Sequence, residues 1–332
     1  MQLLILGYSS IVRRRVLPAA NAIGVFSRIS VASRHHGPAK AGHYAPSADA
    51  GHPAGEDGRP EDVTWFTDYE QALRASGADV AYVSGVNSMH VAWATRALEH
   101  GLHVIVDKPA FPDVESAEQL VALARQRQRA LAEATVFAFH PQMTELRSLM
   151  SDADATRVTM TFSIPPLPDD DFRYRSDSGG GSLYDLGPYV VATSRVLFGA
   201  VPTAVHCDVL TTRGSPEVDT SFGVMLTHDA RGVLAGHCGF ETVYQNRLSA
   251  VTRTRAIDVE RIFSTPPDFP PTLTVLEAGA ARVVHVPAAD AFGVFLGAFC
   301  DAIARNDFDA FLSALLEDAR LLRRLRLAAG RM

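Results

Sequence analysis

Short β-rich runs alternate with amphipathic helical segments over the first 140 residues, and this alternation constrains the fold more than any other feature. Strands are predicted at residues 3–6, 29–32, 80–84 and 104–106, because these runs are rich in Val, Ile and Leu. One helix follows the first strand and another ends at Gly101. Strand–helix–strand repeats require a parallel sheet with helices on its faces. We therefore predict an α/β, doubly wound (Rossmann) dinucleotide-binding domain over residues 1–140.

After about residue 150 the pattern changes to consecutive strands. They are predicted at residues 156–164, 204–212, 219–228, 232–241 and 248–257, with a hairpin connection at 228–232. Residues 292–326 are predicted to be helical. Residues 141–332 are therefore expected to form an α+β domain for substrate binding and oligomerisation, with a large, mostly antiparallel sheet and C-terminal helices that pack back on the first domain. The active site is expected in the cleft between the two domains.

Composition and charge exclude several classes of protein. The net charge is −6 and the pI is about 6.0, so no basic field exists to hold nucleic acid. No run of about 18 apolar residues predicts a membrane span, and no signal peptide is recognised. The three cysteines are far apart in the chain, which indicates reduced thiols and a cytoplasmic protein; they are Cys207, Cys238 and Cys300.

Between residues 35 and 62 the alternation of strands and helices is interrupted by a segment rich in Gly, Pro, Ala and His. Its composition predicts a long loop or a short helix with an insertion. Four histidines occur there: His35, His36, His43 and His52. Their irregular spacing does not match known zinc sites, so we expect no metal.

The first strand leads into Gly7-Tyr8-Ser9-Ser10-Ile11-Val12 and then a helix, which is where a dinucleotide-binding fold places a pyrophosphate. A helix N-terminus offers free N–H groups and a partial positive charge to an anion. Of the usual G-x-G-x-x-G pattern only Gly7 remains, with Ser9 and Val12 in the other positions. We expect Gly7, Ser9, Ser10 and Ile11 to bind the cofactor, although an ordinary strand–helix turn is an equal alternative for this motif alone.

The end of the second strand indicates which nucleotide is bound. An enzyme that uses NAD usually carries an acid there for the ribose diol, whereas this chain has Ala32-Ser33-Arg34. A hydroxyl followed by a guanidinium suits a 2′-phosphate. NADP(H) is therefore favoured, with Ser33 and Arg34 as its ligands, and NAD(H) stays possible. The alternative is that Arg34 is a solvated loop residue.

Several spaced motifs together resemble the glucose–fructose oxidoreductase / inositol dehydrogenase / rhizopine-catabolism (GFO/IDH/MocA) family. In the first half they are Asn87-x-x-His90, Ala97-Leu98-x-x-Gly101-x-His103-Val104 and Asp107-Lys108-Pro109. In the second half the match is Gly179-Gly180-Gly181-Ser182-Leu183-Tyr184-Asp185-Leu186-Gly187-Pro188-Tyr189. The family usually has Glu-Lys-Pro where this chain has Asp107, and many members have His where it has Tyr189.

Three further segments are similar to those of family members that act as 3-ketoreductases on nucleotide-linked deoxysugars. They are Phe162-Ser163-Ile164-Pro165-Pro166, Asp171-Phe172-Arg173 and Phe263-Ser264-Thr265-Pro266-Pro267. The resemblance as a whole covers almost the entire chain. It implies that Asn87, His90, Lys108 and Pro109 contribute to the cofactor site, with His90 in a supporting position, and that Lys108 and Tyr189 are catalytic.

These residue types suit the reduction of a ketone, which needs a hydride at carbon and a proton at oxygen. A tyrosine can donate the proton, but its ordinary pKa of about 10 makes it a slow exchanger at neutral pH. A nearby ammonium lowers that pKa and stabilises negative charge on the substrate oxygen. Lys108 is one of only two lysines in the chain, the other being Lys40, which favours a functional role over that of a surface residue.

The remaining candidates each have a structural alternative. Tyr189 could be a core aromatic residue. Asp185 is expected to orient the catalytic pair or bind substrate hydroxyls, and an N-cap role is an equal alternative. Arg173 and Arg175 are predicted to grip a substrate phosphate, and could equally be exposed loop charges.

The sequence therefore predicts an NADP(H)-dependent oxidoreductase that reduces a keto group on a sugar-like substrate. The similarity to 3-ketoreductases of deoxysugars implies that this substrate is nucleotide-linked. One alternative is an NAD(P)-dependent sugar or cyclitol dehydrogenase. An alternative of another class is a non-catalytic nucleotide-binding regulatory protein, motivated by the eroded glycine pattern at Ser9 and Val12. The resemblance also implies a homodimer or homotetramer formed through the C-terminal sheet.

Overall fold

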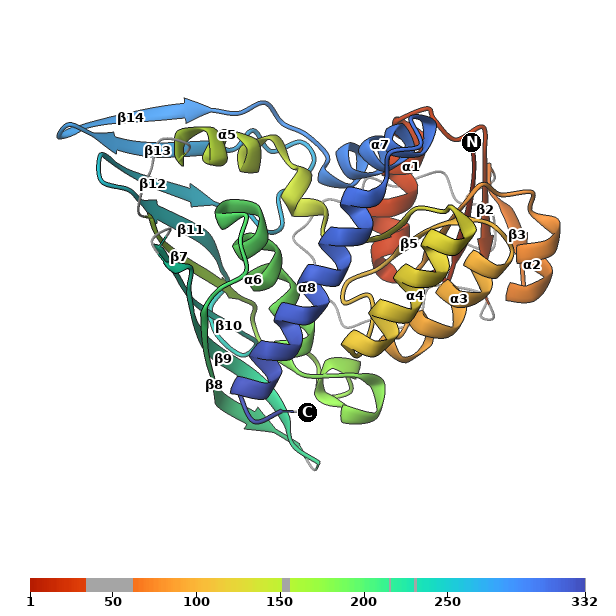
Figure 1. Cartoon of the computed structure of the whole chain (residues 1–332), viewed down its shortest axis with the longest axis horizontal. Coiled ribbons are helices and arrows are strands. Elements are labelled where there is room, and N and C mark those ends of the chain that lie inside the picture. Colours follow the sequence, from red (N-terminus) through yellow and green to blue (C-terminus); the bar gives the residue numbers. More distant parts are fainter. Residues whose placement is uncertain (34–61, 151–155, 215, 230–231, 332) are drawn as a thin grey trace. The chain divides into compact units, whose positions relative to one another are not determined.

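A computed structural model describes residues 1–33, 62–150, 156–214, 216–229 and 232–331 (Figure 1). The chain divides into two compact units. Unit 1 contains residues 1–134 and 295–316, and unit 2 contains residues 135–294 and 317–332. Arg34 and the four loop histidines fall outside the described residues, so the predictions made for them stay predictions.

Unit 1 contains a six-stranded sheet in the order β3-β2-β1-β4-β5-β6, and all of its strand pairs are parallel. This is the strand order of dinucleotide-binding folds, which confirms the predicted doubly wound sheet. The strands are β1 (Gln2–Leu6), β2 (Arg28–Ala32), β3 (Thr64–Phe66), β4 (Val80–Val83), β5 (His103–Val106) and β6 (Leu131–Glu133). Their near-continuous apolar runs are typical of strands that are covered on both faces.

The helical elements of unit 1 connect these strands. They are η1 (Val12–Val16), α1 (Leu17–Ala22), α2 (Tyr69–Ala75), η2 (Asn87–Met89), α3 (His90–Glu99) and α4 (Val114–Arg127). The predicted helix that ends at Gly101 is thus confirmed as α3. Unit 1 also takes in most of α7 (Ala291–Ala304) and the beginning of α8 (Asp309–Ala328).

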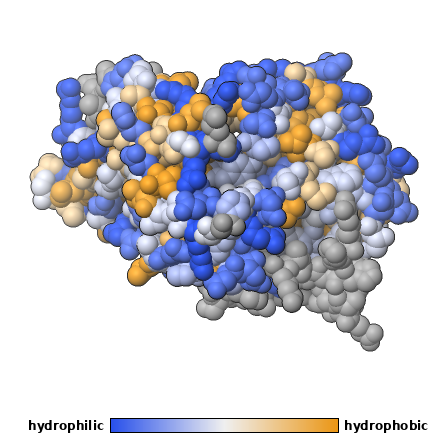
Figure 2. Space-filling view, turned by 90° about the horizontal axis from the view of Figure 1, so that it is seen from below, coloured by the Kyte–Doolittle hydropathy of each residue, from blue (hydrophilic) through white to orange (hydrophobic). Residues whose placement is uncertain are grey.

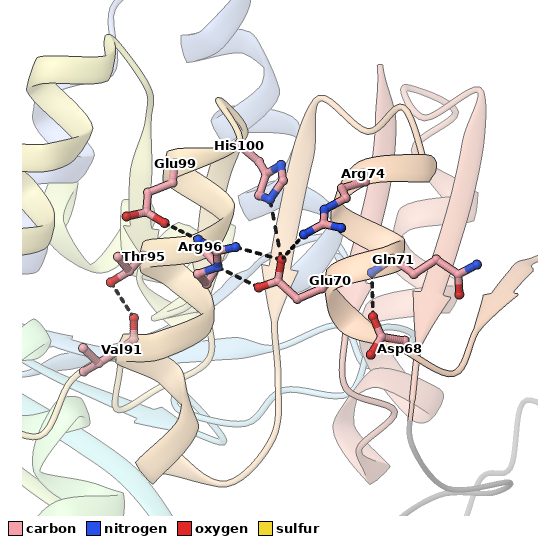
Figure 3. A network of polar contacts seen from close by, with 9 residues as sticks. All are labelled: Asp68, Glu70, Gln71, Arg74, Val91, Thr95, Arg96, Glu99 and His100. Carbon is pink, nitrogen blue, oxygen red and sulfur yellow. Dashed lines mark hydrogen bonds and ion pairs between the residues drawn. The ribbon is translucent and has the colours of Figure 1, made fainter.

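A network of ion pairs joins α2 to α3 (Figure 3). Arg96 forms a two-bond pair with Glu70, at 2.6 and 2.9 Å, and a third bond to Glu99 at 2.7 Å. Arg74 and His100 also lie within 3.8 Å of the Glu70 carboxylate. The hydrogen bonds from Arg96 lower the pKa of Glu70. Because these side chains are partly solvated, the network contributes little to the stability of the fold.

His103, at the start of β5, is expected to make the stability of the protein depend on pH. Its Nδ1 accepts a hydrogen bond from the Ala130 amide at 2.9 Å. Burial and the charge of Arg129 lower the pKa of His103 from 6.5 to about 4. Between these two pH values the unfolded chain binds a proton that the folded protein does not, so the free energy of unfolding falls as the pH is lowered through this window. Allowing for partial exposure, we expect a loss of about 1–2 kcal/mol.

Urea unfolding of the wild type and of His103→Asn between about pH 7.5 and 4 measures this effect. The asparagine side chain offers an amide oxygen to the Ala130 N–H but does not titrate, so the variant should lose less stability at low pH. Parallel curves for the two proteins would show that His103 does not titrate in this way.

Unit 2 contains an eight-stranded sheet in the order β14-β13-β12-β11-β7-β10-β9-β8. Every neighbouring pair is antiparallel except β7 and β10, which are parallel. The strands are β7 (Thr156–Ser163), β8 (Ala204–Arg213), β9 (Val218–Thr227), β10 (Gly232–Gly239), β11 (Gln245–Val251), β12 (Arg255–Glu260), β13 (Thr272–Glu277) and β14 (Ala280–His285). The prediction of a large, mostly antiparallel sheet is confirmed.

Helices line one side of this sheet (Figure 1). The helical elements are η3 (Val136–Phe139), α5 (Pro141–Met150), η4 (Phe172–Tyr174), η5 (Ser176–Ser178) and α6 (Ser182–Phe198). The C-terminal part of α8 packs on α6: a Cβ atom at Gly187 would lie 2.6 Å from the Leu322 side chain. Arg195 of α6 also forms two hydrogen bonds with the buried carboxylate of Asp318, at 2.9 and 2.8 Å.

One predicted strand is wrong in its continuity. Residues 248–257 do not form one strand, because the chain reverses between β11 and β12, where Thr252 Oγ1 accepts the Arg255 amide at 3.0 Å. The predicted C-terminal helices are α7 and α8, and between them the chain leaves the helical conformation at Asn306, which has φ = 52°. Asparagine tolerates this left-handed conformation better than most residues, so it marks the break between α7 and α8.

The face shown in Figure 2 is mostly hydrophilic, with smaller hydrophobic patches. Among the described residues no helix is long and apolar enough to cross a membrane. The three cysteines are free and buried, and burial raises the pKa of Cys207 and Cys238 to about 12 and that of Cys300 to about 11. These thiols are therefore protonated and poorly reactive.

Candidate functional site

The carboxyl edge of the six-stranded sheet begins at Gly7, which directly follows β1. Gly7 has φ = 106°, and a Cβ atom at this position would collide with the carbonyl oxygen of Ser84 after β4. The Gly7 amide also donates to the Ala32 carbonyl at the end of β2, at 2.9 Å. Only glycine can make this approach. The predicted cofactor turn therefore lies where the ends of three neighbouring strands meet.

A chain of hydroxyl groups continues from this turn to the residue before Lys108. The hydroxyl oxygens of Ser9 and Ser84 are 2.8 Å apart, and Ser84 donates to the Asp107 carboxylate at 2.7 Å. The other Asp107 oxygen accepts from Tyr82 at 2.8 Å. Burial and the charge of Asp107 raise the pKa of Tyr82, which keeps this phenol protonated as a donor. Both oxygens of Asp107 are thus bonded within unit 1.

This arrangement explains why a serine replaces the second glycine of the cofactor pattern. Ser9 Oγ also accepts the Val12 amide at 3.3 Å, in the first turn of the following helix. The hydroxyl therefore links that turn to β4 and β5 through Ser84 and Asp107. Sequence reasoning missed Ser84 and Tyr82, although both lie where β4 ends, at the edge where such sheets bind ligands.

His90 holds the segment that follows Lys108. The imidazole is buried, and its Nδ1 lies 3.0 Å from the Pro109 carbonyl and 3.2 Å from that of Ala110. Since both partners are acceptors, Nδ1 carries a proton. Burial lowers the pKa of His90, so the ring is neutral. The Ala110 amide in turn donates to Glu133 at 2.9 Å, and the Lys108–Pro109 peptide is cis. His90 therefore supports this segment from α3.

The donor groups at this edge fit a phosphorylated dinucleotide. Ser9 and Ser10 offer hydroxyls beside the start of the helix, and Asn87, 9% exposed, lies at the start of η2. Ser33 is buried at the end of β2, and its amide donates to Phe66 at 3.0 Å. Neither Ala32 nor Ser33 is an acid, so no carboxylate at these two positions would repel a 2′-phosphate.

In unit 2, the glycine run forms a tight entry to α6. Gly181 has φ = 113°, and a Cβ atom there would lie 2.7 Å from the Asp219 carboxylate. A Cβ atom at Gly180 would lie 2.6 Å from the carbonyl oxygens of Arg173 and Arg175. Side chains at these positions would push the preceding segment away from the helix.

Asp219, on β9, caps α6 from a different part of the chain. Its Oδ2 accepts from the Ser182 hydroxyl at 2.8 Å and from the Leu183 amide at 2.5 Å. The N-cap alternative for Asp185 is therefore wrong, since Gly181 occupies the N-cap position and Asp185 lies in the first turn. No sequence signal near α6 pointed to Asp219, because the contact joins residues far apart in the chain.

Asp185 is held by an ion-pair cluster with Arg173 and Asp171. The Arg173 guanidinium lies 3.1 Å from Asp185 and 3.3 Å from Asp171, whose side chain is fully buried. Burial alone would lower the pKa of Arg173, but the two carboxylates raise it. Arg173 therefore places a positive charge beside Asp185, which lies in the first turn of α6.

Replacing Arg173 with Met is expected to destabilise the protein by about 3 kcal/mol, because it leaves the buried Asp171 carboxylate without its cation. Urea or thermal unfolding measures the effect. Adding Asp171→Asn to this variant should recover part of the loss. Arg175→Met is the matched control, since Arg175 is exposed and its guanidinium bonds to the Ser178 hydroxyl, at 3.2 Å, rather than to a buried carboxylate. Equal losses for the two arginine variants would contradict the prediction.

Tyr189 lies on α6 four residues after Asp185, so the two side chains share one face of the helix. Its ring contacts those of Phe137, Phe162 and Phe263, with centroid distances of 5.4, 4.8 and 5.8 Å. The three phenylalanines are buried, whereas Tyr189 is only partly buried. The ring thus packs against the core, as the structural alternative predicted, while the residue stays partly open to solvent.

No cluster of three or more His, Cys, Asp or Glu side chains suited to a metal occurs among the residues that the structure describes.

Comparison with known proteins gives matches over both units. Residues 4–135 match the model of an oxidoreductase family with an NAD-binding Rossmann fold, and residues 154–257 match the GFO/IDH/MocA C-terminal domain. Two relatives are named dTDP-3,4-didehydro-2,6-dideoxy-alpha-D-glucose 3-reductase. The one from Saccharopolyspora spinosa is 30% identical over 86% of this chain and 82% of its own length. The one from Actinomadura kijaniata is 28% identical over 95% of this chain and 93% of its own.

A solved structure gives the same picture. It is a 3-ketoreductase from Actinomadura kijaniata in complex with NADP and TDP-benzene. The two chains superpose with a TM-score of 0.86 and 26% identity, over 99% of this chain and 98% of the other.

Proposed function

This chain belongs to the GFO/IDH/MocA family of oxidoreductases, and on that premise we propose that it is an NADP(H)-dependent enzyme that reduces a keto group of a nucleotide-linked sugar. Unit 1 binds the cofactor and unit 2 the substrate. The observation that carries the proposal is the carboxyl edge of the six-stranded sheet. There Gly7 packs against Ser84, and hydrogen bonds connect Ser9 through Ser84 to Asp107, the residue before Lys108. The names of the relatives supply the substrate class.

In this proposal the cofactor is held by residues at the ends of β1, β2, β4 and β5. Gly7, Ser9, Ser10 and Ile11 bind the pyrophosphate, and Ser33 and Arg34 bind the 2′-phosphate. Asn87, Lys108 and Pro109 border the nicotinamide end, with His90 supporting them. The bound NADP of the solved relative and the lack of an acid at residues 32–33 both favour NADP(H) over NAD(H).

When bound, NADPH supplies the hydride. Tyr189 donates its phenolic proton to the carbonyl oxygen, and the resulting phenolate regains a proton from solvent. The ammonium of Lys108 stabilises negative charge on that oxygen and on the phenolate. Asp185, held by its ion pair with Arg173, orients the reacting groups. Because Arg173 is already paired with two carboxylates, Arg175 is the better candidate for a substrate phosphate.

The direct test supplies a TDP-linked 3,4-diketo-2,6-dideoxyglucose with NADPH or NADH. We expect NADPH-dependent formation of a product two hydrogens heavier, detected by mass spectrometry, and much slower reaction with NADH. Oxidation of free aldoses or cyclitols with NADP, without reduction of the TDP-sugar, would instead favour the sugar or cyclitol dehydrogenase alternative. Tight NADPH binding without turnover of any keto sugar or alcohol would favour the regulatory alternative.

A homodimer or homotetramer formed through the eight-stranded sheet is part of the proposal. Large apolar side chains that are 44–54% exposed lie on its strands: Leu210 (β8), Met225 (β9), Leu276 (β13) and Val283 (β14). Such side chains on an open sheet face support burial against a second subunit. Leu276→Asp combined with Val283→Asp should shift the protein toward monomer in light scattering, whereas a monomeric wild type would refute the assembly.

A cytoplasmic location also belongs to the proposal, and the three buried free thiols support it. Fractionation of cells that express the native chain tests it, since recovery outside the cytoplasm would contradict it.

A further inference from the structure

The sequence contains the pattern Phe-Ser-x-Pro-Pro twice, at residues 162–166 and 263–267, and neither copy has a role in the chemistry proposed above. In the structure the two copies converge. Phe162 lies near the end of β7, Phe263 follows β12, and their ring centroids lie 5.4 Å apart. Both rings also contact Tyr189. Two segments about 100 residues apart in the chain thus each place a phenylalanine ring against Tyr189.

The contacts around Tyr189 come from several directions. The rings of Phe162 and Phe263 approach it edge-to-face, with interplanar angles of 85° and 70°, and the ring of Phe137 is tilted by 38°. Phe137 and Phe263 also contact each other at 5.4 Å. We call these four residues the aromatic cluster. Such contacts restrict the rotation and translation of a ring more than aliphatic packing does, because edge-to-face pairs have preferred geometry.

Two buried amides fix the backbone that carries Phe263. Asn246, on β11, accepts the Phe263 amide with its side-chain oxygen at 3.0 Å. Asn246 lies directly opposite Phe162 in the pairing of β11 with β7, so it ties the two Phe-Ser-x-Pro-Pro segments together. On the other side, Gln142 of α5 donates to the Ile262 carbonyl at 3.2 Å and to the Thr265 hydroxyl at 2.7 Å.

Buried amides with specific hydrogen bonds are costly unless the geometry is well defined, so they specify one conformation of this segment. Thr265 adds a further bond, donating to the Arg261 carbonyl at 2.6 Å. Arg261 has φ = 55°, which turns the chain sharply at the end of β12 and brings Phe263 into the core. Four hydrogen bonds therefore hold this one reversal: Asn246 with Phe263, Gln142 with Ile262, Gln142 with Thr265, and Thr265 with Arg261.

We infer that the two Phe-Ser-x-Pro-Pro segments form a clamp in which Phe162 and Phe263 are positioning residues for Tyr189. The inference rests on the proposed function, because it assigns the clamp the task of aiming the phenol that donates the proton. A displacement of about 1 Å in a reacting group can reduce the rate by about 100-fold, so a clamp of rings controls turnover without touching the substrate. The affinity for NADPH does not depend on it.

The test replaces Phe263 with Met, which keeps most of the volume and removes only the ring. We expect kcat to fall by about 10- to 100-fold, with little change in the affinity for NADPH. Phe263→Tyr restores a ring and should recover most of the rate. The matched control is Phe198→Met, a buried phenylalanine nine residues after Tyr189 on the same helix, or about 13 Å along its axis. It should lose comparable stability and keep its kcat.

A second readout does not require turnover. In protein labelled with ¹³Cζ-tyrosine, the Tyr189 signal is the one missing from Tyr189→Phe. It should shift in Phe263→Met and stay in place in Phe198→Met. If Phe263→Met does not fold, Thr265→Val removes the hydroxyl used by Gln142 and should shift the same signal by a smaller amount. An unmoved Tyr189 signal, or a kcat equal to that of the control, would overturn the clamp, whereas a shifted signal in a protein without ketoreductase activity would contradict only the proposed function.

Discussion

Tyr189→Phe is expected to lower kcat for keto-sugar reduction by about 10²- to 10⁴-fold, the range that a lost general acid typically costs. The substitution keeps the ring among Phe137, Phe162 and Phe263, so the packing of α6 should persist. Only the phenolic oxygen is removed. Thermal stability and the dissociation constant for NADPH, measured by fluorescence titration, should therefore stay close to those of the wild type.

The matched control is Tyr69→Phe. Tyr69 lies on α2 of unit 1, with its ring packed edge-to-face on Trp93 at 4.8 Å. It should retain wild-type kinetics. If Tyr189→Phe also retained a kcat within about threefold of the wild type, another group would have to supply the proton.

Lys108→Met is expected to reduce kcat/KM by about 10²- to 10³-fold, because it removes a charge that stabilises the developing oxyanion. Methionine retains an unbranched apolar stem of similar length. The segment around position 108 should stay in place, since its supports are the hydrogen bonds of Asp107, the His90 contact to the Pro109 carbonyl and the bond from the Ala110 amide to Glu133. Steady-state kinetics with NADPH and the TDP-keto sugar measure the loss.

Lys108→Arg separates charge from shape. A guanidinium keeps the positive charge but spreads it over a planar fork, so we expect partial activity between those of the wild type and Lys108→Met. Full activity in Lys108→Met would remove lysine from the mechanism. Loss of NADPH binding in both variants would instead assign Lys108 to the cofactor alone.

Much of the fold could be predicted from local pattern. Unbroken apolar runs such as residues 3–6 identified the strands of a parallel sheet. The helix that ends at Gly101 could be predicted from the helical spacing of its apolar residues and from the glycine at its C-terminal end. The reversal between β11 and β12 could not be found this way. It is built from Thr and Arg residues and a side-chain hydrogen bond at Thr252, with no Gly or Pro to mark it. More than one C-terminal helix was predicted, but the position of the break at Asn306 was not, because a strong helical pattern lies on both sides of it.

The candidate site shows the same division. Lys108, Asp185 and Tyr189 could be predicted as site residues because they stand in contiguous motifs. Their supports act across a strand pair or from a distant strand: Ser84 for the cofactor turn, Asp219 for the start of α6 and Asn246 for the clamp. A hydrogen bond between residues that are distant in the chain is not marked by any local sequence motif, so it could not be predicted from this sequence. Arg173 was found, but its pairing with Asp171 and Asp185 was not.

The order in which the chain visits its two units determines how the molecule can be cut and recombined. The chain leaves unit 1 after Ala134 and returns to it at Phe295, where Phe295 and Phe299 bury their rings beside Phe311. A fragment that stops near residue 134 would thus lack residues that belong to its own compact unit, among them these buried rings. Exchange of the cofactor-binding unit between relatives consequently requires three crossovers, after residues 134, 294 and 316, so that residues 1–134 and 295–316 are inherited together.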